Sequence, residues 1–110
     1  EQEIYQTHEI VKALTGVEMN LFSTPSGAYN QTTLDVAKTY GYQTIMWTKD
    51  TIDWRDKVAK TIYDRAVANP QNGDLILMHP TEKTLEVFGD IIDFYQENGF
   101  NVVTVSENIA

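Results

Sequence analysis

The feature that most constrains the fold of this chain is a regular alternation of helix-like segments and short apolar runs. Glycine marks the change from helix-like segment to apolar run each time, at Gly16, Gly41, Gly73 and Gly99. Glycine suits this place because the residue after a helix C-terminus often adopts a left-handed backbone conformation. Strict alternation of helices and strands is typical of an α/β fold with right-handed crossover connections.

Helical spacing of apolar residues supports a helix in each of the segments that precede these glycines. The apolar residues of each segment fall on one helix face: Ile4, Val11 and Leu14; Leu34, Ala37 and Tyr40; Val58, Ala59, Ile62, Tyr63, Ala66 and Val67; and Leu85, Phe88, Ile92 and Tyr95. Asn30 and Thr81 stand just before the second and the fourth segments. Their side-chain oxygens can accept from the free N–H groups of a first helical turn, so we expect both residues to be N-caps.

Short apolar runs at residues 19–22, 44–47, 75–78 and 101–105 are candidates for strands buried on both faces of a parallel sheet. The sequence therefore predicts an α/β fold of four helix-strand units with parallel strands, in one domain that covers residues 1–110. A closed barrel of such units takes about 250 residues. This chain is either a small open sheet or about half of a distorted (β/α) barrel.

Composition argues against several classes of function. The net charge of −8 disfavours a nucleic-acid partner, since binding to phosphates calls for clustered Lys and Arg. No apolar run approaches the roughly 18 residues that a membrane span needs, so we expect none in this chain. The absence of cysteine excludes disulfides and thiolate metal sites. The glycines are dispersed and form no phosphate-binding loop.

Polar residues follow the apolar runs, where the functional side chains of α/β folds gather. His79 follows the third run, and its imidazole is suited to act as an acid or a base near neutral pH. The alternative for His79 is a side chain that only caps a strand end. Asp50 and Asp53 follow the second run. A helical pattern begins after Asp53, so an N-cap is its alternative, and Asp53 gains interest only if the fold brings it near His79.

The remaining aromatic and histidine candidates are less specific. Trp54 is either a core residue or an apolar platform for a sugar ring, whereas Trp47 lies inside an apolar run and is expected in the core. His8 has no second ligand-type residue at a useful spacing, so we interpret it as structural or surface. A metal needs three or four converging donors, and we expect no metal site in this chain.

Taken together, the strand ends resemble the last three motifs of the polysaccharide deacetylase family, also called carbohydrate esterase family four or the NodB-homology domain. Residues 21–27, Leu-Phe-Ser-Thr-Pro-Ser-Gly, resemble the motif Phe-Arg-x-Pro-x-Gly. Residues 47–54 resemble Asp-x-x-Asp-Trp after a tryptophan, and residues 73–79 resemble a Leu-x-His at a strand end. Residues 98–106 are similar to the family's last helix-strand step. The resemblance covers nearly the whole chain and corresponds to the C-terminal half of the family domain.

This resemblance implies a distorted (β/α) barrel that removes N-acetyl groups from chitin-like or peptidoglycan-like glycans. A bound divalent ion, usually zinc, would polarise the amide carbonyl and activate water. His79 aligns with the catalytic acid of the family, and Asp53 with the carboxylate that orients it. Trp54 and Leu77 would line the acetyl pocket.

The same resemblance places the turn at Pro25 and Ser26 in the substrate site, where a backbone N–H near Ser26 would stabilise the oxyanion. Ser23 occupies the place of the motif arginine that normally holds the catalytic base. A relaxed third motif is similar to the sporulation-type, deacetylase-like subgroup of bacilli. Ser23 therefore puts ordinary activity in question.

Two further family motifs, an Asp-Asp pair and a His-x-x-x-His pair, carry the metal ligands and the catalytic base and do not occur here. We expect them before Glu1, in an extracellular or wall-associated parent, and expect this chain alone to hold no metal and to be inactive. The alternative to a metal-dependent deacetylase is a glycan-binding or structural domain without turnover. A third possible interpretation is a complete small α/β domain with an unrelated role. A half barrel exposes sheet edges, so self-association of the chain is also expected.

Overall fold

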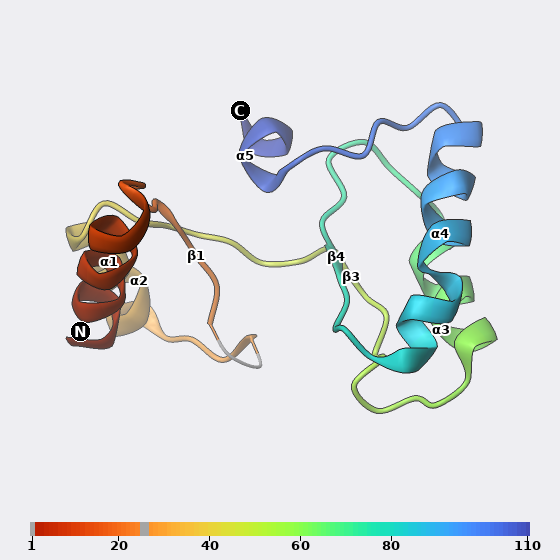
Figure 1. Ribbon diagram of the computed structural model, residues 1–110, viewed down its shortest axis with the longest axis horizontal. Coiled ribbons are helices and arrows are strands. Elements are labelled where there is room, and N and C mark those ends of the chain that lie inside the picture. Colours follow the sequence, from red (N-terminus) through yellow and green to blue (C-terminus); the bar gives the residue numbers. More distant parts are fainter. Residues whose placement is uncertain (1, 25–26) are drawn as a thin grey trace. The chain divides into compact units, whose positions relative to one another are not determined.

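The computed structural model describes residues 2–24 and 27–110 (Figure 1). The chain divides into two compact units, Glu1–Met46 and Trp47–Ala110. Helices and short parallel strands alternate along it, which confirms the α/β class predicted from the sequence. In the described residues no helix is long and apolar enough to span a membrane.

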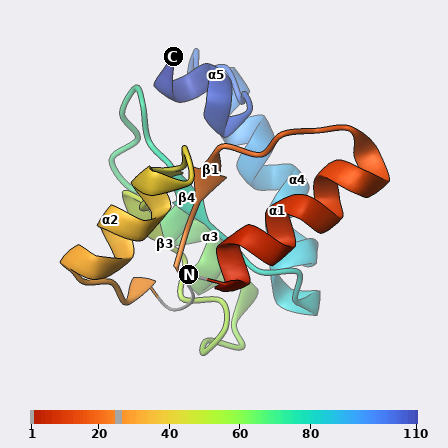
Figure 2. The same ribbon diagram turned by 90° about the vertical axis from the view of Figure 1, so that its left-hand side faces the viewer.

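Among its described residues the first unit holds two α-helices and one pair of strands. Its elements in chain order are α1 (Gln2–Thr15), β1 (Leu21–Phe22), α2 (Gln31–Thr39) and β2 (Gln43–Thr44). β1 and β2 pair in parallel, with Leu21 opposite Gln43, and β1 lies between the two helices in Figure 2. α2 begins as predicted, because the side chain of Asn30 accepts a hydrogen bond of 2.9 Å from the backbone N–H of Thr33.

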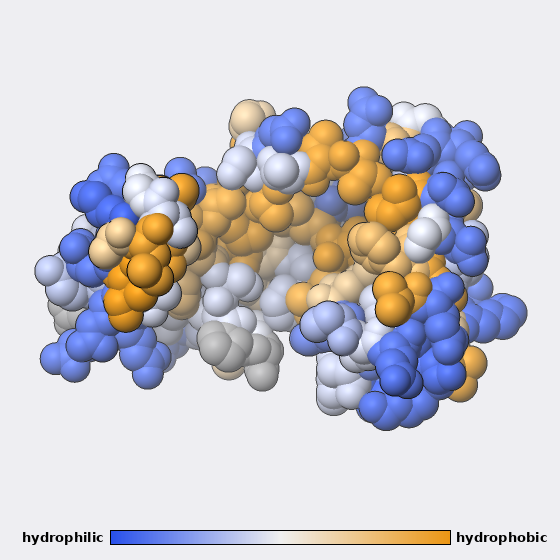
Figure 3. Space-filling view, in the orientation of Figure 1, coloured by the Kyte–Doolittle hydropathy of each residue, from blue (hydrophilic) through white to orange (hydrophobic). Residues whose placement is uncertain are grey.

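α1 is attached to the first unit mainly through aromatic side chains. His8 Nδ1 lies 2.7 Å from the hydroxyl of the buried Tyr42, and their rings meet edge to face. This contact agrees with a structural interpretation of His8. No residue of α1 is fully buried, and Leu14 is 80% exposed. Figure 3 accordingly shows hydrophobic side chains on the surface of α1.

The second unit carries both residues of the predicted catalytic pair. Its elements are β3 (Lys49–Asp50), α3 (Ala59–Val67), β4 (Ile76–Leu77), α4 (Glu82–Glu97) and α5 (Val105–Ile109). β3 and β4 pair in parallel, with Asp50 opposite Leu77. α3 and α4 lie side by side (Figure 1). Thr81 caps α4 as predicted, since its side chain accepts from the backbone N–H of Thr84.

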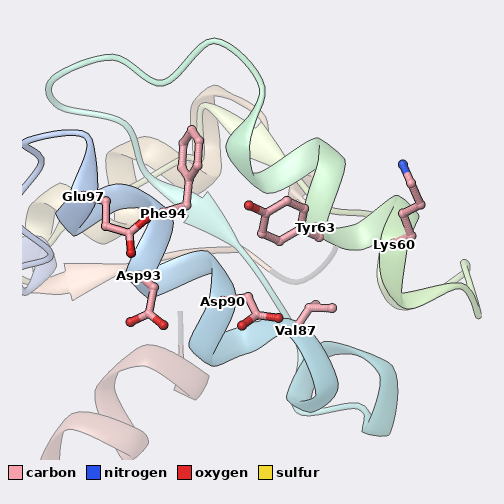
Figure 4. A pocket seen from close by; sticks show the side chains of 7 residues that line it. All are labelled: Lys60, Tyr63, Val87, Asp90, Asp93, Phe94 and Glu97. Carbon is pink, nitrogen blue, oxygen red and sulfur yellow. The ribbon is translucent and has the colours of Figure 1, made fainter.

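The contact between α3 and α4 forms the core of the second unit. Ile62, Ala66 and Ile91 are fully buried there, and the burial of each isoleucine contributes about 2–3 kcal/mol. Tyr63 and Phe94 meet edge to face with their ring centroids 6.5 Å apart. These rings border a groove shown in Figure 4, whose lining residues are Lys60, Tyr63, Val87, Asp90, Asp93, Phe94 and Glu97. The core is thus apolar, and the groove beside it has an acidic rim.

The buried side of α4 is displaced by one residue from the apolar face read in the sequence. Thr84 and Ile91 are buried, whereas Leu85 and Phe88 are 76% and 47% exposed. Spacing of seven residues puts Thr84 and Ile91 on one helix face. α4 therefore turns Thr84 toward the interior, where its hydroxyl donates a hydrogen bond to Asp53.

Two strands differ from the sequence prediction. The run at 101–105 pairs with no strand among the described residues, and Val102 and Val103 are about half exposed. Thr104 instead caps α5 by accepting from the backbone N–H of Glu107 at 3.2 Å. A strand requires a hydrogen-bonded neighbour, whereas a capping pattern is satisfied within four residues. The helix therefore forms where the strand does not.

The predicted strand at 44–47 is replaced by two shorter ones: β2, which overlaps the predicted run only at Thr44, and β3, which follows it. β3 is polar, and Lys49 forms an ion pair of 3.3 Å with Asp74. Its position is fixed by pairing with β4, since the backbone N–H groups of Thr48 and Lys49 both donate to the carbonyl of Leu75.

Candidate active site

Asp53 and His79 follow neighbouring strands of the second unit. Asp53 lies three residues after β3, and His79 lies two residues after β4. β3 and β4 are parallel, so their carboxyl ends meet at the same edge of the sheet. The fold therefore brings together the two residues that were predicted as a catalytic pair.

The segment that leads to Asp53 is held by hydrogen bonds to β4 and by a turn. The side chain of the buried Thr51 donates to the carbonyl of Leu77 at 2.9 Å. The backbone N–H of Ile52 donates to Asp50 Oδ1 at 2.8 Å. Ile52 itself has a φ of 53°, in the left-handed region that β-branched residues rarely adopt. This backbone conformation directs the next residue, Asp53, into the interior.

Arg65 of α3 attaches the same loop to the helix. Its Nη1 donates to the carbonyl of Thr51 at 3.1 Å and forms an ion pair with Asp56. Hydrogen bonds from Arg65 and Arg55 hold the pKa of Asp56 below its ordinary value, against the opposing effect of burial. The loop from Thr51 to Asp56 is thus fixed at both ends by one guanidinium.

The carboxylate of Asp53 is surrounded by hydrogen-bond donors. Asp53 is 1% exposed. Its Oδ1 lies 2.8 Å from Nδ1 of His79. Its Oδ2 accepts from the backbone N–H of His79 at 2.5 Å and from the hydroxyl of Thr84 at 2.7 Å. Both oxygens are therefore used inside the protein.

These donors determine the charge of Asp53. Burial raises the pKa of its carboxyl, but the backbone N–H of His79, the hydroxyl of Thr84 and the ring of His79 outweigh burial and lower the pKa below its ordinary value. At neutral pH Asp53 is a carboxylate and can only accept hydrogen bonds. Nδ1 of His79 therefore carries a proton, which leaves Nε2 to act on the exposed side of the ring.

The N-cap alternative for Asp53 is wrong. Val58, and not Asp53, occupies the N-cap position of α3. The oxygens of Asp53 bind His79 and Thr84 instead of the first turn of α3. The side chain of His79 is 44% exposed, whereas that of its partner Asp53 is buried. Part of the His79 ring therefore reaches the surface. A titratable ring at the surface, held by a buried carboxylate, is an arrangement suited to proton transfer.

The other predicted site residues lie in different places. Trp54 follows Asp53 directly and is 58% exposed, while Leu77 is half-buried in β4. Trp47 is half-buried and not a full core residue. Ser23 is exposed and belongs to the first unit. The predictions for Pro25 and Ser26 concern residues outside the described ranges.

The residues present do not fit the divalent ion that the family resemblance implies. Among the described residues no three His, Asp or Glu side chains converge as a metal site would require. Both oxygens of Asp53 and Nδ1 of His79 are already engaged with each other and with Thr84. Among the described residues the site brings together a histidine and a buried carboxylate that is hydrogen-bonded to it.

Comparison with known proteins tests the family resemblance. A sequence profile described as polysaccharide deacetylase matches residues 1–45. The crystal structure of a CE4 family pseudoenzyme from Bacillus anthracis is 30% identical and superposes with a TM-score of 0.90, over 96% of this chain and 38% of that chain. The resemblance to the polysaccharide deacetylase family is confirmed. A variant of the same pseudoenzyme, described as having restored enzymatic activity, superposes equally well.

Two curated members of this set of relatives extend the comparison. The uncharacterized protein YlxY of Bacillus subtilis is 33% identical over 106 residues, which are 96% of this chain and 33% of YlxY. A peptidoglycan-N-acetylglucosamine deacetylase of Bacillus cereus is 32% identical over 93 residues, which are 79% of this chain and 44% of that enzyme. The chain thus spans between a third and a half of the length of these two relatives.

Sequence reasoning missed Thr84 and Arg65 as parts of the site. Thr84 stands three residues after the N-cap Thr81, a spacing that indicates only helix capping. Arg65 lies inside α3 and carries no local pattern that points to the loop it binds. Both residues were detectable only through contacts between segments far apart in the chain.

Proposed function

We propose that residues 1–110 are the C-terminal part of a metal-dependent deacetylase that removes N-acetyl groups from a peptidoglycan-like or chitin-like polysaccharide. The observation that carries this proposal is the contact of His79 Nδ1 with the buried carboxylate of Asp53 at 2.8 Å. The naming of relatives as peptidoglycan deacetylases supports the substrate class and a location outside the cell or in the wall.

His79 is the proposed catalytic acid. Water loses a proton to the catalytic base and adds through its oxygen to the carbonyl carbon of the N-acetyl group, and the C–N bond then breaks to release acetate. The leaving nitrogen takes a proton from Nε2 of the protonated imidazole, while Nδ1–H remains bonded to Asp53. The anionic Asp53 stabilises the cationic ring and keeps Nε2 directed outward.

Trp54 and Leu77 are the proposed walls of the acetyl pocket. Trp54 adjoins Asp53 in sequence and exposes a large part of its ring. An exposed indole offers an apolar surface on which a sugar or a methyl group can rest. Pro25 and Ser26, which lie outside the described residues, are also proposed to bind substrate, with a backbone N–H near Ser26 for the oxyanion.

The proposed divalent ion, for which zinc is the family's usual choice, needs ligands that the described residues do not bring together. We place those ligands and the catalytic base in a part of the domain that precedes the chain. The isolated chain is accordingly proposed to be inactive. Its exposed hydrophobic residues, such as Leu14 and Leu85, are consistent with the self-association expected of a part of a barrel.

The second candidate is a deacetylase-like domain that binds glycan without turnover. Ser23 favours it, because it replaces the motif arginine, and so does the likeness to a CE4 family pseudoenzyme. Ser23 is exposed, so an arginine can be introduced there without disturbing the core.

The experiment that separates the two candidates compares the wild-type full-length protein with its Ser23→Arg variant. Acetate release from N-acetylated peptidoglycan is measured with and without a chelator. Chelator-sensitive release by the wild type supports the deacetylase. No release by either protein, together with retention on insoluble peptidoglycan, supports the binding domain. Release by Ser23→Arg alone identifies a domain that lost turnover through that position.

A further inference from the structure

Thr84 is a buried polar residue whose place in the fold is not explained by helix capping alone. It lies in the first turn of α4 and is 5% exposed. Its hydroxyl donates to Oδ2 of Asp53 at 2.7 Å. Residues in the first turn of a helix usually turn such hydroxyls to solvent or to their own backbone.

The direction of the hydrogen bonds around Thr84 follows from the charge of its partner. An ionised Asp53 only accepts, so the Thr84 hydroxyl must donate to it. The Thr84 oxygen is then free to accept from the hydroxyl of Thr81, which lies 2.8 Å away. Thr81 in turn accepts from the backbone N–H of Thr84 at 3.1 Å. A directed series of donors therefore runs from Thr81 through Thr84 to Asp53.

Such a series strengthens each of its members, because every donor is polarised by the one before it. The first turn of α4 adds the positive end of the helix dipole near the same carboxylate. Without the Thr84 hydroxyl, Oδ2 would keep only the backbone N–H of His79 among its described donors. The terminal torsion of an aspartate has a broad minimum, so one donor fewer allows the carboxylate to turn.

We propose that Thr84 is a positioning residue of this site, which fixes the carboxylate of Asp53 so that Oδ1 stays on Nδ1 of His79. Thr81 assists by polarising the Thr84 hydroxyl. The catalytic meaning of this positioning rests on the proposed deacetylase function. The positioning itself does not, because it can be measured on Asp53 directly in the chain.

The test is a carbon-13 NMR titration of the Asp53 carboxyl in the wild-type chain and in the variants Thr84→Val and Thr84→Ser. Valine matches threonine in shape and lacks the donor, so the titration midpoint of Asp53 should shift upward. Serine keeps the hydroxyl, so the midpoint should return to the wild-type value. A midpoint that is the same in Thr84→Val and the wild type overturns the proposal.

The matched control is Thr51→Val. Thr51 is buried like Thr84, and its replacement by valine likewise removes one hydrogen bond, but to the carbonyl of Leu77 and not to Asp53. Thr51→Val should lower stability without shifting the Asp53 midpoint. An equal upward shift in Thr51→Val and Thr84→Val would show a general effect of loosened packing and would contradict a specific role of Thr84.

If Thr84→Val does not fold, the wild-type chain still provides a test. The Thr84 methyl resonance should titrate with the same midpoint as the Asp53 carboxyl, and a methyl resonance that ignores this titration overturns the proposal. In the full-length protein, Thr84→Val should reduce kcat about tenfold with little change in KM. A wild-type protein without activity would refute the proposed function and leave the NMR result standing.

Discussion

His79 binds one carboxylate, that of Asp53, with both its backbone and its side chain. The backbone N–H donates to Oδ2 at 2.5 Å, and Nδ1 of the ring lies 2.8 Å from Oδ1. This double contact fixes the ring relative to its own main chain, so the ring cannot rotate away without losing a contact with the buried Asp53. The orientation of Nε2 is therefore built into the loop after β4.

Replacement of Asp53 by asparagine should reverse the tautomer of His79. The backbone N–H of His79 needs an acceptor, so the amide oxygen must take the place of Oδ2, and the amide NH₂ then faces Nδ1. Nδ1 must accept, and the ring proton moves to Nε2. Nitrogen-15 NMR of the imidazole reports this change. Asp90→Asn, at an exposed position of α4, is the control and should leave the tautomer of His79 unchanged.

Asp53 should also contribute to the pH dependence of stability. Its pKa is lower in the folded chain than in the unfolded one, so its contribution is present above the unfolded value and is lost as pH falls through the folded value. Urea unfolding should show that Asp53→Asn loses less stability than the wild type between about pH 6 and about pH 3. Asp56 and Asp74, whose pKa values are also lowered, remain in both proteins and cancel in the comparison. Equal losses would contradict an ionised, hydrogen-bonded Asp53.

The left-handed conformation of Ile52 gives an unusual order of stability for two variants. At a φ of 53° a side chain costs about 1–2 kcal/mol relative to glycine. Ile52→Gly should therefore be more stable than Ile52→Ala, by roughly 1 kcal/mol in chemical denaturation. At Asp90, an exposed position inside α4, the order should be reversed, because alanine is the better helix former. The same order at both positions would mean that Ile52 is not left-handed in solution.

Arg65 should matter more for stability than its place on α3 suggests. Arg65→Met removes the bonds to Thr51 and Asp56 and should lower the free energy of unfolding by about 1–3 kcal/mol. Arg65→Lys should recover part of the loss, since an ammonium can replace one bond. Lys60→Met is the control, because the exposed pair of Lys60 with Asp64 is worth at most about 0.5 kcal/mol. Equal effects of Arg65→Met and Lys60→Met would show that Arg65 does not hold the loop from Thr51 to Asp56 on α3.

The sequence predicts the features that depend on residues close together in the chain. It does not predict those that depend on contacts between distant segments. The caps Asn30 and Thr81 were readable because each satisfies N–H groups three residues away. β3 was not readable as a strand, since the polar pair Lys49–Asp50 is a strand only through its pairing with β4. The strand prediction at 101–105 was wrong because strand formation again depends on a partner: in the described chain no strand lies beside its valines.

The candidate site shows the same division. Asp53 and His79 were each recognisable from their position after an apolar run and from the family motifs, but their contact depends on the register of β3 against β4. Thr84 depends on how α4 is rotated, and Arg65 on how α3 packs under the loop. Neither rotation nor packing is encoded in a short local pattern, so these two supporting residues required the structure.

The most direct test of the central claim is acetate release from an N-acetylated peptidoglycan by the full-length protein and its His79→Gln variant. His8→Gln is the matched control, because His8 lies in the other unit and contacts Tyr42. We expect release by the wild type and by His8→Gln, and a loss of at least about a hundredfold in His79→Gln. Release that survives in His79→Gln would contradict the assignment of His79 as the acid. No release by the wild type would contradict the deacetylase itself.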